Sequence, residues 1–374
     1  GWNGEDPIAM AAAAARSELR PVGGHAAAGL LVLQSLSSGS GEVSRLRSLP
    51  GVRWVERDQP VRIALIPNDP LFAQQQALRQ ARFERAWEFG FGSPGITVAM
   101  IDTGLEADHV DLAGRVLPGW NAIQGNQDTR DGHGHGTLCA GALGASTDNL
   151  LGISGAAGGC LLMPVKVLGD DGSGMVSDVA AGIVWAADHG ANILSVSLAG
   201  PGTSDALVDA VRYAWNKGCL VICAAGNSSS GQPVLPAAAV QAIAVGSVDA
   251  YDLRSSFSNF GSWVDLAAPG ESVWGTAIGG GYRTGSGTSL ACPLVSGAAA
   301  LVWSKLGPLA KASDVRARLE TTAQWVGGWL GYGRIDAEAA LDPNALQEAT
   351  LSLSRNELAG GSSITAKVRL SRPA

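Results

Sequence analysis

Short apolar runs recur between residues 96 and 249, and each of them leads into a turn that contains glycine or aspartate. The runs are ITVAMIDTG (96–104), ANILSVSLAG (191–200), CLVICAAGN (219–227) and QAIAVGSVD (241–249). Their apolar residues are consecutive and often β-branched, whereas a strand with one solvated face alternates apolar and polar residues. The pattern therefore predicts parallel strands that are covered on both faces.

Two amphipathic segments of helix length lie between these runs. They are VSDVAAGIVWAADHG (176–190) and SDALVDAVRYAWNKG (204–218). Ser177 and Ser204 are the expected N-caps, and a glycine closes each segment. Alternation of strand and helix favours an α/β fold with a doubly wound, mostly parallel sheet and helices on both faces. Ligands bind beyond the carboxyl ends of the strands in such folds, so polar residues at those ends are the first functional candidates.

The pattern differs at the two ends of the chain. Residues 1–66 predict a small α+β unit, and residues 67–345 contain the α/β pattern. From residue 346 the sequence alternates apolar and polar residues and has no apolar face of helix length. This last segment resembles the opening strands of an immunoglobulin-like domain, so we expect residues 346–374 to be the start of a truncated β domain.

Composition narrows the possible partners. The chain has 26 Lys and Arg against 33 Asp and Glu, a net charge of −7 without a basic cluster, so we expect no nucleic-acid partner. Its longest apolar stretches, such as 290–303, are shorter than 18 residues and contain Ser, Gly or Pro, so we expect no membrane span. The five cysteines cannot all pair and lack CxxC spacing, which favours free thiols over a redox or zinc site.

Three polar residues occupy the ends of predicted elements. They are Asp102 in AMIDTG, His135 in DGHGHGTLCAG and Ser289 in GSGTSLACPLVSG. Each alone is explained by a local role, as a turn or helix cap, a loop residue and an N-cap respectively. Together they supply an acid, a base and a nucleophile, the set that activates a serine hydroxyl. His133 in the same glycine-rich run is a competing base.

These three segments, in the order Asp, His, Ser, resemble the subtilisin-like serine proteases, the subtilases of peptidase family S8. AAGN (224–227), SLAG (197–200) and FSNFGSWVDLAAPG (257–270) resemble further motifs of that family, and the likeness covers roughly residues 68–342. The resemblance implies a subtilisin-like fold and a monomeric serine endopeptidase. It also implies that protein or peptide substrates are cleaved through an acyl-enzyme, and that the protein is secreted or held at the cell envelope.

The resemblance assigns roles residue by residue. Ser289 becomes the nucleophile, His135 the general base by its His-Gly-Thr spacing, Asp102 the residue that orients His135, and Asn227 the donor to the oxyanion. The substrate-binding residues that it implies are Ser197, Leu198, Ala199, Gly200, Ala224 and Gly226.

Some positions depart from the family pattern. Leu290 replaces a methionine and Leu294 a histidine, and neither change affects the expected chemistry. Ala199 replaces a glycine that lines the first specificity pocket, and Val234 falls near the expected floor of that pocket. We therefore expect a narrower pocket that prefers modest apolar side chains to large aromatic ones.

Two further features follow from the resemblance. Cys139, four residues after the catalytic His, matches the free cysteine of thiol-containing members, although a small buried hydrophobe explains it equally well. We expect Cys292 nearby, and mercurial sensitivity through these thiols. Asp69, Asp111 and Asn149 match a structural calcium site, although each alone is a common turn or cap residue.

The segment VRWVERDQPVRIAL (52–65) resembles the end of the family's inhibitory propeptide, of the inhibitor-I9 type. In that family the propeptide assists folding, blocks the active site and is removed by self-cleavage. The resemblance predicts a precursor with its cleavage point between Leu65 and Asn68 and its own propeptide as an intramolecular inhibitor. The alanine-rich start of the chain departs from this pattern.

Two other functions use the same residues. One is a non-catalytic binding or scaffold protein that keeps the fold, but such a protein has no need of Asp102, His135, Ser289 and Asn227 together. The other is an esterase with the same triad, which the peptide-binding motif SLAG and the segment like a propeptide disfavour. The sequence thus predicts a serine endopeptidase.

Overall fold

The computed structural model describes residues 19–25, 30–35, 52, 55, 65–200 and 202–342. The chain divides into two compact units, Gly1–Ile63 and Ala64–Ala374. The helix expected in the first unit, most of the segment resembling a propeptide, and the β domain expected from residue 346 all lie outside the described residues. The domain boundaries of the sequence analysis therefore stay predictions.

The described part of the first unit is a two-stranded antiparallel hairpin. Its strands are β1 (Leu19–His25) and β2 (Leu30–Ser35), and their register shifts between Pro21 and Gly23. A proline lacks the N–H that continues a ladder, so a local irregularity at this position is expected. The strand β2 agrees with the apolar run LLVLQ of the sequence.

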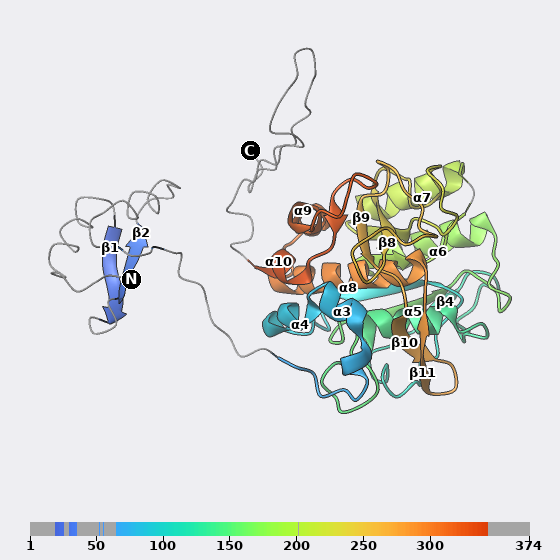
Figure 1. The fold of residues 1–374 in the computed structure, drawn as a ribbon. Helices are drawn as coiled ribbons and strands as arrows, with labels where there is room; N and C mark the ends of the chain where they lie inside the picture. Colours follow the sequence, from blue (N-terminus) through green and yellow to red (C-terminus); the bar gives the residue numbers. More distant parts are fainter. Residues whose placement is uncertain are drawn as a thin grey trace, which may run out of the picture. The chain divides into compact units, whose positions relative to one another are not determined.

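An eight-stranded sheet forms the centre of the second unit (Figure 1). In spatial order its strands are β12 (Gly333–Arg334), β9 (Leu266–Pro269), β8 (Ala242–Val248), β7 (Leu220–Ala224), β6 (Ile193–Val196), β3 (Thr97–Asp102), β5 (Leu161–Lys166) and β4 (Trp120–Asn121). All neighbouring pairs in this sheet are parallel. The strand order reverses direction at β3, as expected of a doubly wound sheet.

Alternate residues of each strand enter two separate cores. In β3, Val98 and Met100 belong to one core, while Ala99 and Ile101 belong to the other, and all four are buried. Because both faces are covered, the strands need apolar residues at consecutive positions, which explains the uninterrupted runs in the sequence. The prediction of a mostly parallel sheet with helices on both faces is confirmed.

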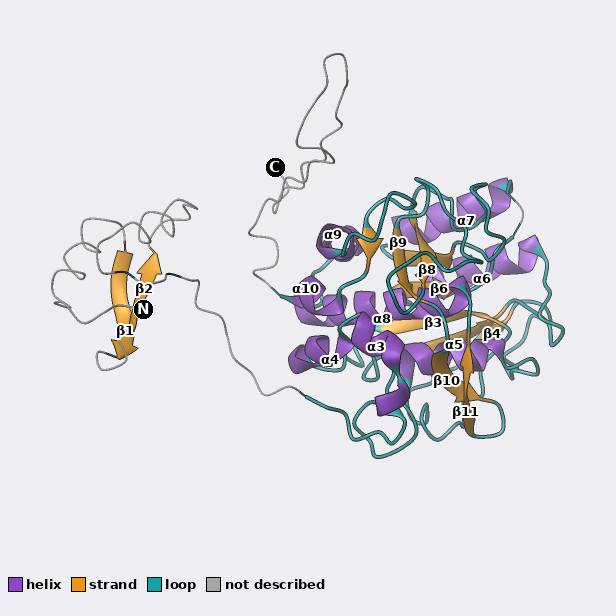
Figure 2. Ribbon diagram, in the orientation of Figure 1, coloured by secondary structure: helices purple, strands orange, loops and turns teal. Residues whose placement is uncertain are grey.

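Helices cover both faces of the sheet, as Figure 2 shows in purple around the orange strands. One face packs against α3 (Gln76–Gln80), α4 (Phe83–Ala86), α5 (His135–Gly144), α8 (Thr288–Leu306), α9 (Ala312–Thr322) and α10 (Ala337–Leu341). The other face packs against α6 (Val176–Asp188) and α7 (Asp205–Asn216). Two short 3₁₀ helices, η2 (Phe72–Gln74) and η3 (Trp87–Phe89), and a hairpin of β10 (Val273–Ala277) and β11 (Gly281–Gly285) complete the described elements.

Two local predictions need correction or comment. Ser204 caps α7 as expected, by accepting a hydrogen bond from the Leu207 N–H at 3.3 Å. Ser177 is not the N-cap, because α6 begins at Val176, two residues earlier than expected, and Met175 occupies the N-cap position. Val176 packs against one of the cores, so the apolar face of α6 already starts there.

The helix α8 is longer than the apolar stretch recognised in the sequence. It spans 19 residues and is long and apolar enough to cross a membrane by length and composition, but 78% of its apolar window is buried inside the protein. It contacts β6, β7, β8 and β9. These contacts make α8 a core helix of the second unit.

Candidate active site

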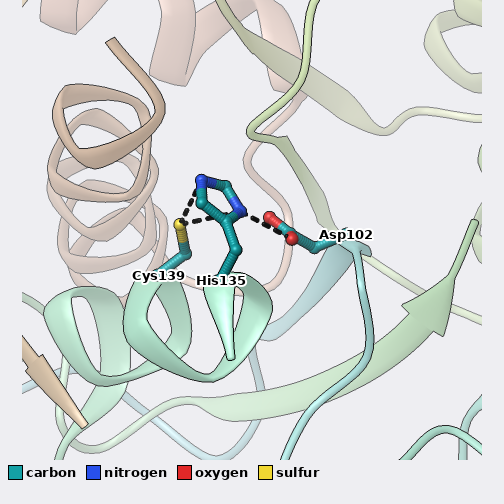
Figure 3. A group of neighbouring side chains, drawn as sticks. All are labelled: Asp102, His135 and Cys139. Atoms are coloured by element: carbon teal, nitrogen blue, oxygen red, sulfur yellow. Dashed lines mark hydrogen bonds and ion pairs between the residues drawn. The ribbon is translucent and has the colours of Figure 1, made fainter. Parts of the chain in front are cut away.

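Three elements bring the acid, the base and the nucleophile to one edge of the sheet. Asp102 ends β3, His135 begins α5, and Ser289 is the second residue of α8. A strand end and two helix beginnings expose polar side chains where the buried segments stop. Figure 3 shows the side chains of Asp102 and His135 directed toward each other, with Cys139 on the other side of the ring.

His135 is the histidine that contacts the carboxylate. Its Nδ1 lies 2.8 Å from Oδ1 of Asp102, whose side chain is 1% exposed, while the His135 side chain is 25% exposed. The backbone N–H of Thr103 donates to the same oxygen at 2.7 Å. His133 is exposed and packs edge-on against the His135 ring at 6.3 Å. His135 rather than His133 therefore contacts Asp102, in agreement with the prediction from the His-Gly-Thr spacing.

Two neighbours favour the protonated form of His135. The pKa of His135 lies above the usual value of 6.5 because the Cys139 sulfur and the Asp102 carboxylate both favour the charged ring, against the effect of burial. Burial itself raises the pKa of Cys139, so this thiol is protonated at neutral pH. Near neutral pH the upward shift of the His135 pKa therefore comes from Asp102.

The side chains of Ser289 and Asn227 both lie close to Gly287. A Cβ atom at Gly287 would lie 3.0 Å from Ser289 Oγ and 3.3 Å from Asn227 Nδ2, and the φ of Gly287 is +152°. Asn227 Oδ1 accepts hydrogen bonds from the N–H and hydroxyl of Thr288, at 2.8 and 3.0 Å. These bonds fix the amide so that its NH₂ group lies on the side of Ser289. None of the described residues accepts a hydrogen bond from that NH₂ group.

A cavity of about 540 Å³ contains this group of residues. His135, Ser289 and Asn227 line it, together with the segments 171–176 and 197–200. The predicted substrate-binding residues Ser197, Leu198, Ala199 and Gly200 thus all border the cavity.

Ala224 and Gly226, the other two predicted substrate-binding residues, do not line the cavity. Ala224 ends β7, and the N–H of Gly226 donates to Thr288 Oγ1 at 3.0 Å. A Cβ at Gly226, whose φ is +96°, would lie 2.6 Å from Asn259 Nδ2. Ala224 and Gly226 therefore belong to the backbone segment that positions Asn227 beside the start of α8.

The chain matches known proteins over the unit that contains this site. A family model described as the subtilase family matches residues 93–354. The chain belongs to the subtilase family. Over 279 residues the subtilase is 43% identical to thermitase of Thermoactinomyces vulgaris, which covers 74% of the chain and 99% of that relative.

Two further relatives agree with this assignment. The subtilase is 37% identical over 301 residues to alkaline elastase YaB of Bacillus sp. (strain YaB), with 80% of the chain and 76% of the relative covered. A solved protease structure from Pseudoalteromonas arctica PAMC 21717 has a TM-score of 0.69 and 31% identity, and the match covers 74% of this chain and 98% of that one. The subtilase is a serine endopeptidase with a subtilisin-like fold.

The five cysteines of the subtilase are free and buried. Cys139 Sγ lies 3.9 Å from both ring nitrogens of His135 and donates to the Ser289 carbonyl oxygen at 3.3 Å. Burial, together with the charge of Cys139, raises the pKa of Cys292 to about 12. Cys139 thus lies beside the imidazole, as expected.

The sequence analysis missed Asp131, a buried carboxylate beneath the histidine loop. Its Oδ1 accepts from the N–H groups of His133 and Gly134 at 3.1 and 2.7 Å, and from the Thr103 hydroxyl at 2.8 Å. Its Oδ2 accepts from the N–H and the hydroxyl of Thr137, at 2.8 and 2.7 Å. Asp131 therefore joins the residue after Asp102 to the residues on both sides of His135.

A signal for Asp131 existed in the sequence. It lies four residues before His135 and six before Thr137 in DGHGHGT, where an Asp can cap both a glycine-rich turn and the helix that follows. The hydrogen bond from Thr103 could not be predicted, because it depends on the approach of β3.

The three predicted calcium ligands lie close together around the loop 147–153. Asp69 accepts from the N–H groups of Asp148 and Asn149, both at 3.0 Å, and from the Ser154 hydroxyl at 2.5 Å. Asp111 accepts from the Asn149 side-chain amide at 2.8 Å.

The two carboxylates of this group also influence each other. Burial raises the pKa of Asp111, hydrogen bonds from Asn149 and Ile153 lower it, and the charge of Asp69 raises it. Asp69 and Asp111 are thus near enough to repel, and the hydrogen bonds to their oxygens come from neutral donors.

Proposed function

We propose that Asp102, His135 and Ser289 are the catalytic triad of this subtilase and that it hydrolyses peptide bonds through an acyl-enzyme. The observation that carries the proposal is the 2.8 Å contact between His135 Nδ1 and Asp102 Oδ1 at a cavity that Ser289 also lines. With Nδ1 engaged as a donor, the other ring nitrogen, Nε2, is the one available as a base.

The reaction then proceeds in two halves. Ser289 Oγ attacks the substrate carbonyl carbon while its proton passes to His135 Nε2, and Asp102 stabilises the charged imidazole. His135 gives this proton to the leaving amine, the C–N bond breaks, and the acyl group stays on Ser289 as an ester. Water, deprotonated by His135, attacks the ester and releases the acid, which returns the serine hydroxyl.

The tetrahedral oxygen needs donors on the side of Ser289. The Asn227 side-chain NH₂ group supplies one donor. The beginning of α8 adds the backbone N–H of Ser289, which has no acceptor among the described residues, and the positive end of a helix dipole. Loss of one such donor typically costs about 10²–10³ in kcat.

A fluorophosphonate probe tests the triad. The native chain is expected to be labelled on Ser289, while Ser289→Ala remains unlabelled and His135→Ala is labelled far more slowly. A native chain that is folded but not labelled would leave only a binding or scaffold role for the cavity.

The pocket for the residue before the scissile bond is proposed to be narrow. Ala199 lines the cavity, and a Cβ at Gly226 would lie 3.6 Å from Val234 Cγ2. A relative of 37% identity is named an alkaline elastase, which supports a preference for small apolar side chains. Peptide profiling with Ala, Val, Leu, Phe and Tyr at this position tests it, and a strong Phe or Tyr preference contradicts it. Ala199→Gly is expected to admit larger side chains.

Calcium is the proposed structural cofactor. The donor set fits this ion, because Asp69, Asp111 and Asn149 offer hard oxygen ligands and the loop 147–153 adds carbonyl groups. Bound calcium would remove the repulsion between the two carboxylates and stabilise this loop. Catalytic steps do not involve it.

We also propose that the chain is a monomeric, secreted or envelope-bound precursor that removes its own N-terminal unit. The likeness of residues 52–65 to a propeptide supports this. Mass spectrometry of the native chain beside Ser289→Ala tests it. Cleavage between Leu65 and Asn68 is expected in the native chain alone, and an active form that begins before residue 50 contradicts it.

Mercurial inhibition through Cys139 and Cys292 stays a prediction. The metal-ligating atoms of Asp102, His135 and Cys139 lie within 4.8 Å of one another, the one such group of three among the described residues. Mercury bound to Cys139 would displace the imidazole. A Cys139→Ala, Cys292→Ala variant that is as mercury-sensitive as the parent contradicts this idea.

A further inference from the structure

One wall of the cavity carries charge that the reaction does not use. Of the side chains that line the cavity, three are ionisable, namely His133, His135 and Asp171, and none is Lys or Arg. Asp171 lies in the turn before α6, within 169–175, and is exposed. A Cβ at Gly172, the next residue, would lie 3.0 Å from His133 Nε2. The turn and His133 thus form one continuous wall.

This wall lies beside the catalytic imidazole. The rings of His133 and His135 are 6.3 Å apart at their centroids. A peptide bound in extended form directs alternate side chains to opposite sides. If the side chain next to the attacked carbonyl points toward Ala199 and Gly200, the side chain one residue earlier points toward His135 and the wall beyond it.

The nearby positive charges are already engaged. Lys166 Nζ lies 2.8 Å from Asp170 Oδ1. Arg130 pairs with Asp128, and Arg283 donates to the carbonyl oxygen of Gly134. These cations therefore have partners outside the cavity.

Asp171 has no basic partner of this kind among the described residues. Its oxygens accept from the N–H and hydroxyl of Ser173 at 2.9 and 2.8 Å, which leaves acceptor capacity on both. The same hydrogen bonds, and to a smaller extent the charge of His133, lower the pKa of Asp171, so the carboxylate is charged at neutral pH. The wall therefore carries a charged carboxylate and neither Lys nor Arg.

We propose that Asp171, with His133 beside it, makes the subtilase prefer substrates with Lys or Arg at the second residue before the scissile bond. The basic side chain extends past the His135 ring and meets the Asp171 carboxylate at the cavity rim. An acidic side chain at the same place meets a like charge. This inference rests on the proposed function, because it assumes that the acyl part of the substrate occupies this cavity.

Matched peptides measure the preference. The substrates are succinyl-Ala-Ala-X-Ala p-nitroanilides with X as Lys, Ala or Glu, and the readout is the ratio of kcat/KM values at low ionic strength. The native subtilase is expected to favour Lys over Glu by roughly tenfold. An exposed carboxylate attracts the Lys substrate and repels the Glu substrate, and each effect is modest at a solvent-exposed site. High salt should reduce the ratio, because exposed charges are screened.

Variants at one position assign the effect. Asp171→Asn, which keeps an acceptor for the Ser173 N–H, should bring the Lys to Glu ratio to about twofold or less, and Asp171→Lys should invert it. Asp178→Asn is the control, since it removes the same charge from the first turn of α6 without lining the cavity. Its ratio should equal that of the native chain.

The outcomes distinguish a failure of the charge preference from a failure of the proposed function. Hydrolysis of all three peptides with a ratio near one, or a ratio that Asp171→Asn leaves unchanged, overturns the charge preference and leaves the triad intact. An unlabelled, folded native chain that hydrolyses none of them overturns the proposed function itself.

Discussion

Two regions of the subtilase bury carboxylates and surround them differently. Beneath the cavity, Asp131 accepts five hydrogen bonds, while Asp102 uses one oxygen for His135 and its other oxygen is buried without a hydrogen-bond partner among the described residues. Around the loop 147–153, Asp69 and Asp111 repel each other and receive hydrogen bonds from neutral donors. Burial is common to all four. The groups around each carboxylate thus differ with its role. Asp131 holds a loop, Asp102 is proposed to stabilise a charged imidazole, and Asp69 and Asp111 are proposed to bind a cation.

The largest effect is expected where the carboxylate faces a group that becomes charged. Asp102→Asn keeps the shape of the side chain but removes the charge that stabilises the His135 imidazolium and its correct tautomer. We expect kcat to fall by about 10⁴, as for the equivalent change in other serine proteases, with KM nearly unchanged. Steady-state kinetics with a peptide nitroanilide measures this. A variant that keeps a tenth of the native kcat would place the base elsewhere.

Asp131 should give a smaller loss of rate but a larger loss of stability. Asp131→Ala leaves the five donors around it without an acceptor, and each unsatisfied buried donor costs about 1–3 kcal/mol unless water reaches it. We expect kcat to fall by about 10²-fold, because a shift of about 1 Å at His135 is enough for such a loss.

The melting temperature separates Asp131 from Asp102. It should fall for Asp131→Ala by several degrees and change little for Asp102→Asn, which retains the hydrogen-bonding shape of the side chain. Equal melting temperatures for the two variants would remove the distinction between a positioning and a charge-stabilising carboxylate.

The pH dependence of activity reports the charge of Asp102 directly. Catalysis requires neutral His135. A charged Cys139 and the Asp102 carboxylate both raise the pKa of His135, but the Cys139 thiol is neutral near pH 7, so Asp102 is the cause there. Activity should therefore fall tenfold per pH unit on the acid side, with a midpoint above 6.5. A profile of kcat/KM from pH 5 to 10 measures this, and a midpoint below 6.5 would contradict the upward shift. Cys139→Ala should leave the midpoint almost unchanged, because the neutral thiol carries no charge there.

Calcium removal should give the smallest effect on rate and act through stability. If the free calcium concentration is a hundred times the dissociation constant, chelation lowers the free energy of unfolding by about 2.7 kcal/mol. We expect EDTA to lower the melting temperature by several degrees and added calcium to restore it, as followed by circular dichroism. In Asp111→Asn the response to EDTA should largely disappear. An undiminished response in this variant would move calcium to another site.

The sequence was sufficient to predict the sheet and to find the residues of the proposed triad, and the reason is local. Strands covered on both faces need consecutive apolar residues, so β3, β6, β7 and β8 were visible as runs, and the reactive residues stand where such runs end or helices begin. Resemblance to a family then supplied the roles of Asn227 and Cys139. These features depend mainly on residues that are neighbours in the chain.

Other features depend on which segments meet in space. The start of α6 was predicted wrongly. Ser177 is the better capping residue, but Val176 packs against the core and is already helical. Asp131 was missed because one of its donors, Thr103, comes from another strand end. The charge of the cavity wall could not be predicted from the sequence, because it depends on which cations are paired elsewhere, as Lys166 is with Asp170.

The placement of Ser289 on α8 links activity to the integrity of the whole catalytic unit. Because this helix is a central element of the core, its beginning cannot lose order while the surrounding layers stay intact. Heat inactivation and global melting should then coincide. A partly unfolded molecule would then be inactive. Folded molecules could cleave it, but it could not cleave them.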